Sequence, residues 1–413
     1  MNIGIFTDTY SPEINGVVTS IRQLEDELTK HGHHVYIITS SSYRKIVRIN
    51  NVIHMPGINI KKLYGYNVSG FYSVFGAKYI SDLKLDIIHA QTEYGIGIFA
   101  RIMAMQFNIP LVYTYHTMME DYTHYLSKYL TRYSTRPLKS FMKSASRVYA
   151  NRCTQLIVPS NKTAEAMVDY GVTNHINIIP TGIDLTKFRN DQINNTTINA
   201  LKEKYDIDSN TFCFIYVGRL AQEKSVDEII EAFKILREQH LKHFKFIIIG
   251  DGPSFEELKA LVASYKLSKE IIFLGKIKND LIPLYYHLGH CFISTSTTET
   301  QGLTFIEAMA SGLPVICSYD KNLADLIING ENGYVINNVN DLALMMGKMM
   351  KLDHDSYQNL KKHAQASIIK YSSSIFYDKV MAVYHKAIEE NKTNDKSFKN
   401  IRRIRSLSSF FRE

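Results

Sequence analysis

The sequence predicts an α/β protein in which two Rossmann-like domains face each other across a cleft. Two observations support this fold class. Short β-rich runs alternate with amphipathic helical segments, and the same alternation begins again after a polar, Asn-rich stretch near the middle of the chain. Such alternation is typical of a doubly wound parallel sheet. A chain of 413 residues is long enough for two domains, each with its own hydrophobic core.

The first predicted domain covers residues 1–187. A helix is expected after its first strand, over Val17–His31, because the apolar residues of this segment recur at helical spacing. The predicted strands are Ile3–Phe6, Val35–Thr39, Ile87–Ala90, Leu111–Tyr115 and Leu156–Pro159.

The second predicted domain covers residues 211–373 and repeats the pattern, with helices over Val226–Glu238 and Phe255–Tyr265. A polar linker, residues 188–210, should join the two domains. Residues 374–390 should form a helix that packs back on the first domain, and residues 391–413 should form a basic, weakly ordered tail. The predicted strands are Phe212–Val217, Phe246–Ile249, Ile271–Leu274, Cys291–Ser294 and Val315–Cys317.

The composition narrows the class of protein. Apolar residues make up 45% and charged residues 21%, an ordinary globular balance. The four cysteines lie in or beside apolar runs without a C-x-x-C pair, which indicates reduced, buried thiols in a cytosolic protein. The N-terminus lacks the order of a signal peptide, and no apolar run approaches the roughly 18–20 residues that span a bilayer. A net charge of +8 favours nucleic acid, anionic lipid or phosphorylated substrates as partners.

Two motifs of the first domain follow predicted strands, at the sheet edge where ligands of such folds bind. Gly16, at the start of a helix, would let a phosphate approach backbone N–H groups, although a plain turn glycine is the commoner use. His116 in "YTYHTMMEDY" should face the cleft and take part in function, although a lone histidine is more often structural. Glu120 and Asp121 lie one helical turn later and could contact an acceptor hydroxyl.

In the second domain, "YVGRLAQEKSVDEII" places Arg219 and Lys224 between a strand and a helix. A forked guanidinium and a flexible ammonium suit a diphosphate and could neutralise the charge that develops on a departing nucleotide. Two solvated loop cations are the alternative interpretation of this pair.

The segment "TETQGLTFIEAMASGLPVI" carries two glutamates around a glycine. Glu299 should lie in a loop and Glu307 inside the following helix, with the N–H groups of Gly302, Leu303 and Thr304 at the helix entrance. Carboxylates pair well with vicinal hydroxyls, so one glutamate could bind a sugar and the other a ribose, with a diphosphate on the amides between them. A helix with two solvent-facing acids is the alternative.

These motifs together make the chain resemble glycosyltransferase family 4, whose members have the two-domain GT-B fold. The resemblance spans the chain to about residue 340, and its most specific part is the paired-glutamate segment with the Arg/Lys pair. The matching elements, in the family's order, are "NGVV", "HGHHVYIIT", "PTGID", "GRLAQEK", "GDGP" and "ETQGLTFIEAMASGLPVI".

The resemblance implies a role for each candidate residue. Gly16 would touch the diphosphate from the first domain, and His116 would lie near the sugar. The first domain would also bind the acceptor and the membrane. Arg219 and Lys224 would bind the diphosphate from the second, nucleotide-sugar domain. Glu299 would position the donor sugar, Glu307 would hold the ribose, and Ile277 would offer backbone contacts to the base.

The resemblance also implies the chemistry. Family members retain anomeric configuration, and enzymes of this type generally need no bound metal or other cofactor. The motifs are most similar to those of bacterial enzymes that glucosylate diacylglycerol, which favours transfer of glucose from UDP-glucose to 1,2-diacylglycerol. A soluble, phosphoinositol or already glycosylated acceptor is the enzymatic alternative, and a non-catalytic GT-B binding protein is an alternative of another class.

The distribution of charge gives an independent indication of membrane binding. Between Tyr122 and Ala164 there is no Asp or Glu. Basic residues recur every four positions there, interleaved with aromatic and aliphatic residues that we expect to be exposed. A basic amphipathic surface of this kind suits a peripheral protein on the anionic inner face of the cell membrane, although an ordinary solvated helix face is the alternative. No nucleic-acid module appears. The predicted membrane-binding residues are Lys128, Arg132, Arg136, Lys139, Lys143 and Arg147.

Overall fold

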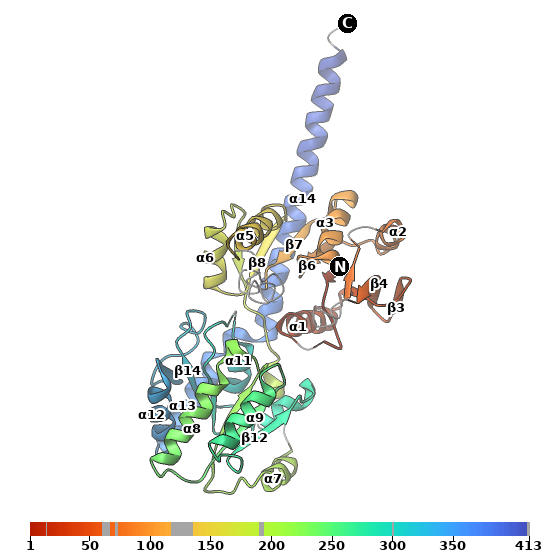
Figure 1. Cartoon of the computed structure of the whole chain (residues 1–413). Helices are drawn as coiled ribbons and strands as arrows, with labels where there is room; N and C mark the ends of the chain where they lie inside the picture. The colour runs from red at the N-terminus through yellow and green to blue at the C-terminus, as the bar shows by residue number, and fades with distance from the viewer. Residues whose placement is uncertain are drawn as a thin grey trace. The chain divides into compact units, whose positions relative to one another are not determined.

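The computed structural model divides the chain into two compact α/β units (Figure 1). Unit 1 consists of Met1–Gly182 with Ser373–Glu413, and unit 2 consists of Ile183–Ser372. The structure describes residues 1–13, 15–59, 67–70, 73–116, 135–189, 194–299 and 301–410. In both units, the central strands are buried and parallel, because helices cover the two faces of the sheet.

Unit 1 contains a nine-stranded sheet in the order β3-β4-β2-β1-β6-β7-β8-β9, with β5 paired to β4. Its strands are parallel except at one edge, where β4 is antiparallel to both β3 and β5. The strands are β1 (Asn2–Thr7), β2 (His34–Ser41), β3 (Val47–Ile49), β4 (Val52–Asn59), β5 (Asn67–Ser69), β6 (Ile87–Ala90), β7 (Leu111–Thr114), β8 (Gln155–Val158) and β9 (Ile176–Ile178).

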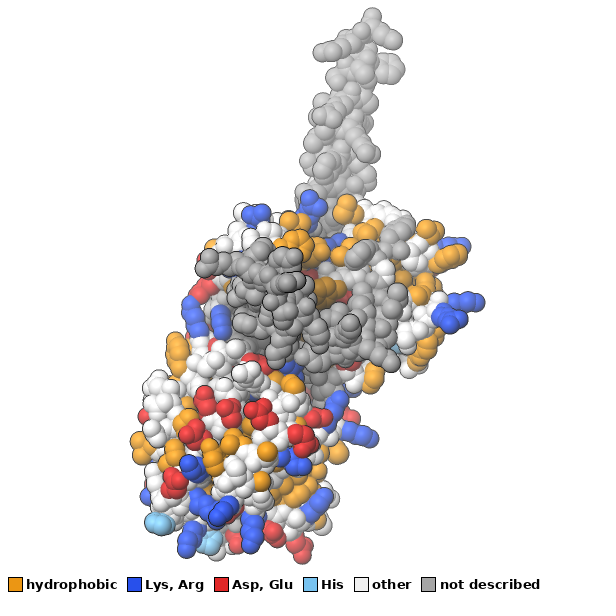
Figure 2. Space-filling view, in the orientation of Figure 1, with side chains coloured by type: hydrophobic (Ala, Val, Ile, Leu, Met, Phe, Trp, Pro, Cys, Tyr) orange, Lys and Arg blue, Asp and Glu red, His pale blue; other side chains and the backbone are white. Residues whose placement is uncertain are grey.

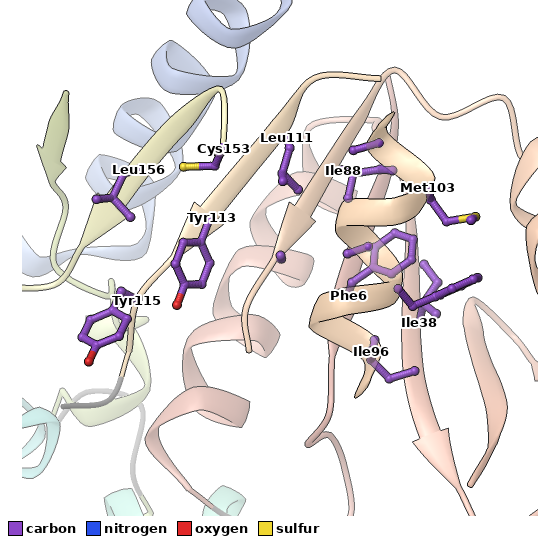
Figure 3. Close-up of a cluster of buried hydrophobic side chains, with 14 of the residues drawn as sticks. Phe6, Ile38, Ile88, Ile96, Met103, Leu111, Tyr113, Tyr115, Cys153 and Leu156 are labelled. Atoms are coloured by element: carbon purple, nitrogen blue, oxygen red, sulfur yellow. The ribbon is translucent and has the colours of Figure 1, made fainter. Parts of the chain in front are cut away.

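Alternate residues of these strands belong to two separate cores. On one face, Phe6, Ile38 and Ile88 pack with Ile96 and Met103 of helix α3 (Figure 3). On the other face, neighbouring strand residues pack against helices α1 and α14. The helices of unit 1 are α1 (Gly16–Lys30), α2 (Val74–Asp82), α3 (Gly95–Phe107), α5 (Thr135–Asn151), α6 (Asn161–Asp169) and α14 (Ser373–Phe410).

Unit 2 contains a six-stranded parallel sheet in the order β12-β11-β10-β13-β14-β15. The strands are β10 (Phe212–Val217), β11 (Phe244–Ile249), β12 (Ile271–Gly275), β13 (Cys291–Ser294), β14 (Val315–Ser318) and β15 (Gly333–Ile336). The α-helices are α7 (Asn195–Lys204), α8 (Val226–Glu238), α9 (Phe255–Ser264), α10 (Ile282–Tyr286), α11 (Leu303–Ala310), α12 (Val339–Met350) and α13 (His354–Ser367).

Two predicted boundaries need correction. Residues 194–210 do not form a free linker, because they carry helix α7, and Ile198 and Ile207 are buried in a core of unit 2. Residues 391–410 are not an irregular tail, because α14 continues to Phe410. All four cysteines are buried and free, as expected. Among the described residues, no helix is long and apolar enough to cross a membrane.

Candidate active site

The candidate residues cluster at the point of each sheet where the strand order reverses. In unit 1 this point lies between β1 and β6, and in unit 2 it lies between β10 and β13. Loops that leave two such neighbouring strands diverge to opposite sides of the sheet and leave a crevice at the carboxyl ends. The fold therefore positions His116 and Gly16 at one sheet, and Arg219, Lys224 and Glu299 at the other.

The structure brings Lys224 and Glu299 into direct contact within unit 2. The ammonium Nζ of Lys224 lies 2.6 Å from Glu299 Oε1 and 3.2 Å from Ser296 Oγ. The two charged side chains are only 22% and 15% exposed, so their ion pair is partly shielded from solvent. Among the described residues, these contacts occupy two of the three N–H bonds of the ammonium, which leaves one for a ligand oxygen.

Arg219 has a different environment from Lys224. Its Nη2 lies 2.9 Å from Glu223 Oε1, and its side chain is 42% exposed. The hydroxyl of buried Tyr216 donates a hydrogen bond to the Arg219 carbonyl and fixes the backbone there. The guanidinium is thus partly exposed to solvent on a fixed backbone.

Glycines bring two loops of unit 2 into backbone contact. Gly250, the first glycine of "GDGP", has φ +143°, and a Cβ there would lie 1.8 Å from the carbonyl oxygen of Gly218. The loop after β11 can therefore pack against the loop that carries Arg219 only if this position is glycine.

The backbone of Glu299 is fixed by two residues that follow β14. Its N–H donates to Asp320 Oδ2 over 3.0 Å, and its carbonyl accepts a hydrogen bond from the side-chain amide of Asn322. Asp320 also accepts the N–H of Asn322, so the two residues act as one clamp. The sequence motifs did not indicate these residues, because their contacts are to main-chain atoms of a segment 21 or more residues away.

Helix α11 begins directly after this loop. Its N-cap residue Gly302 has φ +73°, a conformation that favours glycine, and the N–H groups of Leu303 and Thr304 lie in the first turn. Glu307, also on α11, accepts a hydrogen bond of 3.0 Å from the hydroxyl of Tyr286. Burial raises the pKa of Glu307 from 4.5 to about 7, and the Tyr286 hydrogen bond opposes that rise.

Ile277 lies in the loop after β12, half-buried against the same core as α11. Its predicted contribution is a backbone contact, which depends on the position of the loop and not on the side chain. The site therefore includes loops after β10, β12 and β13, all at the carboxyl edge of the unit 2 sheet.

In unit 1, Gly16 is the first residue of α1 and is exposed. The preceding Asn15 caps the helix, because its side-chain oxygen accepts the N–H of Val18 over 2.9 Å and its amide donates to Thr9 Oγ1 over 3.0 Å. The predicted helix start at an Asn–Gly pair is thus confirmed.

His116 lies two residues beyond the end of β7 and is half-buried. Its Nε2 is 2.5 Å from the side-chain oxygen of Gln91, which follows β6. Burial lowers the pKa of His116 from 6.5 to about 4, so the imidazole is neutral at pH 7. Glu120 and Asp121 lie outside the described residues.

Part of the predicted membrane surface can be described on helix α5. Phe141 and Val148, seven residues apart on one face of the helix, are 68% and 40% exposed. Met142 and Ser146 are buried. Arg147 is exposed beside them, whereas Lys143 is half-buried and its Nζ lies 5.1 Å above the ring of Tyr170. Of the other predicted residues, Lys128 and Arg132 lie outside the described residues, and the side chains of Arg136 and Lys139 are likewise not described.

On the visible face of unit 2, acidic and basic side chains are interspersed (Figure 2). No group of three or more His, Cys, Asp or Glu side chains that could bind a metal ion occurs within the described ranges.

Two Rossmann-like units, each with candidate residues near its switch point, define the GT-B type of glycosyltransferase fold. Similarity to known proteins supports this class. Residues 14–187 match the family model "Glycosyltransferase Family 4", and residues 197–367 match "Glycosyl transferases group 1". The Anabaena HepE protein in complex with UDP and glucose superimposes with a TM-score of 0.71 at 17% identity, over 92% of this chain and 98% of that chain. A sucrose-phosphate synthase from Thermosynechococcus elongatus has the same TM-score at 18% identity, over 94% and 99% of the chains.

Closer relatives are known from sequence. An alpha-monoglucosyldiacylglycerol synthase of Acholeplasma laidlawii is 36% identical over 394 residues, which covers 95% of this chain and 98% of the relative. A protein of the same name from Streptococcus pneumoniae is 35% identical over 83% of this chain and 77% of the relative. The chain belongs to this glycosyltransferase family and is an enzyme, which removes the alternative of a non-catalytic binding protein.

Proposed function

We propose that this enzyme transfers glucose from UDP-glucose to 1,2-diacylglycerol with retention of the anomeric configuration, at the surface of an anionic membrane. The observation that carries the donor part is the contact between Lys224 and Glu299 at the switch point of unit 2. The names of the two relatives support the acceptor part, since both synthesise monoglucosyldiacylglycerol by name.

In the proposed complex, unit 2 binds the nucleotide. The remaining N–H of Lys224 and the exposed guanidinium of Arg219 bind the diphosphate, together with the amides of Gly302, Leu303 and Thr304 and the backbone of Gly16. Glu307 accepts hydrogen bonds from the ribose, and the backbone at Ile277 contacts the base. Glu299 accepts hydrogen bonds from glucose hydroxyls, and its clamped backbone keeps the carboxylate in place.

The proposed reaction occurs on one face of the sugar. The free hydroxyl oxygen of diacylglycerol forms a bond to the anomeric carbon as the bond from that carbon to the diphosphate oxygen breaks. The electron pair of the broken bond leaves with UDP, and the hydroxyl proton passes to the departing phosphate. Lys224 and Arg219 stabilise the negative charge that develops on the diphosphate. The proposal needs neither a metal ion nor another cofactor.

Helix α5 supports the membrane part of the proposal. Exposed Phe141 and Val148 would enter the interfacial region of the bilayer, and Arg147 would bind lipid headgroups. Each basic residue near an anionic leaflet contributes about 1 kcal/mol, so the acid-free segment around α5 would favour anionic over zwitterionic lipid.

Radiolabelled UDP-glucose, incubated with the full-length protein and vesicles of 1,2-diacylglycerol in anionic phospholipid, tests the proposal. We expect labelled glucosyl lipid whose anomeric configuration by NMR matches that of the donor. The Glu299→Ala protein is the inactive control. Absence of labelled lipid would refute the acceptor, and labelling only when glycosylated lipid replaces diacylglycerol would favour a second-sugar transferase. Activity that is the same without vesicles would favour a soluble acceptor.

A further inference from the structure

A continuous chain of buried polar side chains links helix α14 to His116 within unit 1. The hydroxyl of Tyr384 lies 2.7 Å from His89 Nδ1, and His89 Nε2 lies 2.7 Å from Thr114 Oγ1. The side-chain nitrogen of Gln91 lies 3.1 Å from the same His89 Nε2, and its oxygen lies 2.5 Å from His116 Nε2. Tyr384, His89 and Gln91 are at most 3% exposed.

The alternation of strand residues explains why these side chains meet. Ile88 and Ala90 of β6 point into the core around α3, so His89 and Gln91 point to the face covered by α14. On the neighbouring strand β7, Tyr113 and Tyr115 face α3 in the same way, so Thr114 and His116 share the α14 face.

Helix α14 completes this face from a distant part of the sequence. Phe376 and Val380 pack on the strands beside Tyr384, and the two apolar residues line one enclosed cavity of about 10 Å³ together with His89, Gln91 and His116.

The amide of Gln91 determines which groups of the hydrogen-bond chain donate and which accept. An amide nitrogen can only donate, so the single lone pair of His89 Nε2 accepts from Gln91. His89 therefore carries its proton on Nδ1 and donates it to Tyr384. The amide oxygen of Gln91 can only accept, so His116 carries its proton on Nε2 and keeps an unprotonated Nδ1. Burial lowers the pKa of His89 to about 3, which keeps that ring neutral as well.

We propose that Tyr384, His89 and Gln91 are positioning residues that fix the tautomer and ring orientation of His116. This series of hydrogen bonds leaves Nδ1 of His116 unprotonated, so that it can accept a hydrogen bond from a hydroxyl of the donor sugar. This inference rests on the proposed function, because it assigns His116 to a bound sugar. It gives α14 a role in catalysis although Tyr384 itself touches no substrate.

Removal of the Tyr384 hydroxyl, at the far end of the hydrogen-bond chain, should change each hydrogen bond as far as His116. In Tyr384→Phe, the Nδ1 proton of His89 loses its acceptor, and a buried unpaired N–H is unfavourable. The proton moves to His89 Nε2, the Gln91 amide turns over to accept it, and its nitrogen then donates to His116 Nε2. His116 is left with its proton on Nδ1, so it can no longer accept from the sugar.

Tyr377→Phe is a matched control on the same helix. The hydroxyl of Tyr377 also contacts a histidine nitrogen, His33 Nε2, at 3.1 Å, but it has no connection to His116. Gln91→Met is a second test variant, because it removes both amide contacts at nearly constant volume. Thermal unfolding of all variants identifies any general loss of structure.

The direct measurement is the histidine tautomer, by long-range proton–nitrogen NMR of full-length protein labelled with nitrogen-15 histidine. The His116 signals are assigned from their loss in His116→Gln. We expect the Nε2–H form in the wild type and in Tyr377→Phe, and an increased Nδ1–H form in Tyr384→Phe. We also expect a loss of about tenfold in kcat/KM for UDP-glucose in Tyr384→Phe and Gln91→Met, with unchanged affinity for UDP.

An unchanged His116 tautomer in Tyr384→Phe would overturn the inference, and so would a changed tautomer with unchanged kcat/KM. An equal loss in Tyr377→Phe would reduce Tyr384 to a structural role. Failure of the proposed function has a different signature: the wild-type protein would form no glucosyl lipid, whatever the NMR spectra show.

Discussion

The two units share the strand order around their switch points but differ in the candidate residues that they carry there. Unit 2 presents charged groups on loops, with Lys224 paired to Glu299 and Arg219 to Glu223. Unit 1 presents a neutral, buried hydrogen-bond chain that ends at His116. The contrast fits a division of labour under the proposed function: charged groups of unit 2 bind the diphosphate, Glu299 binds glucose hydroxyls, and His116 of unit 1 adds a neutral contact to the sugar.

The physical origin of this difference is the position of the functional residues relative to the strands. Lys224, Arg219 and Glu299 of unit 2 lie beyond the strand ends and pair with opposite charges. His89 and Gln91 of unit 1 lie at the end of a strand under helix α14, where burial keeps groups neutral and hydrogen-bonded. Four experiments test this contrast, from the largest expected effect to the smallest.

Glu299→Ala should have the largest effect, a loss of roughly 1,000-fold in kcat. The substitution removes the acceptor for sugar hydroxyls and leaves Lys224 without its 2.6 Å partner. Steady-state kinetics with UDP-glucose and diacylglycerol vesicles measure the loss, and circular dichroism checks the fold. Glu331→Ala, at an exposed position of the same unit, is the control and should keep full activity. Activity within threefold of wild type would remove Glu299 from the site.

Lys224→Met should lower kcat roughly 100-fold, because one cation near the leaving diphosphate is lost while the aliphatic stem is kept. The same change at Lys234, whose Nζ lies 3.8 Å from Glu238 on the surface of α8, should have no effect. UDP affinity measured by calorimetry should also fall in Lys224→Met. Normal UDP affinity and normal kcat together would show that the charge of unit 2 serves another purpose.

The double substitution Phe141→Ser with Arg147→Glu should weaken binding to anionic vesicles by about tenfold. It removes one exposed apolar contact and reverses one basic charge on α5. Vesicle sedimentation measures binding, and Lys259→Glu, an exposed charge reversal in unit 2, is the control. Equal sedimentation of wild type and double variant would contradict membrane docking through α5.

Glu307→Gln should produce the smallest effect, a change in stability that depends on pH. The pKa of Glu307 is raised from 4.5 to about 7 in the folded protein, so the wild type loses stability as pH rises across that range. The neutral isostere has no such loss. Thermal unfolding should therefore show a Tm gain of a few degrees for Glu307→Gln at pH 8 and none at pH 4.5. A gain of equal size at both values would show that ionisation of Glu307 is not its cause.

Much of the fold could be predicted from the sequence, because buried parallel strands and amphipathic helices have strong, different periodicities. Helix α8 has the predicted bounds, Val226–Glu238. Strands β3, β4, β5, β9 and β15 were missed. The predicted linker was wrong because its polar composition concealed Asn194 as a helix cap and buried Ile198.

The candidate site was predictable where a residue lies in the segment between a strand and the next helix, as Lys224 and Glu299 do. It was not predictable where partners come from distant segments. Tyr384 lies 295 residues from His89, and Asp320 contacts Glu299 through the backbone N–H of that residue. The polar residues at alternate positions in "IHAQ" and "YTYH" were the available signal for the buried chain, because both interrupt strands that are otherwise apolar.

The division of labour between the units is tested most directly by comparing the dissociation constants of UDP and UDP-glucose by calorimetry, without acceptor, for wild type, Lys224→Met and His116→Gln. Lys224→Met should weaken both ligands to a similar extent, whereas His116→Gln should weaken UDP-glucose about tenfold and leave UDP unchanged. Equal weakening of both ligands by His116→Gln, or of neither, would contradict the assignment of a sugar contact to His116 of unit 1.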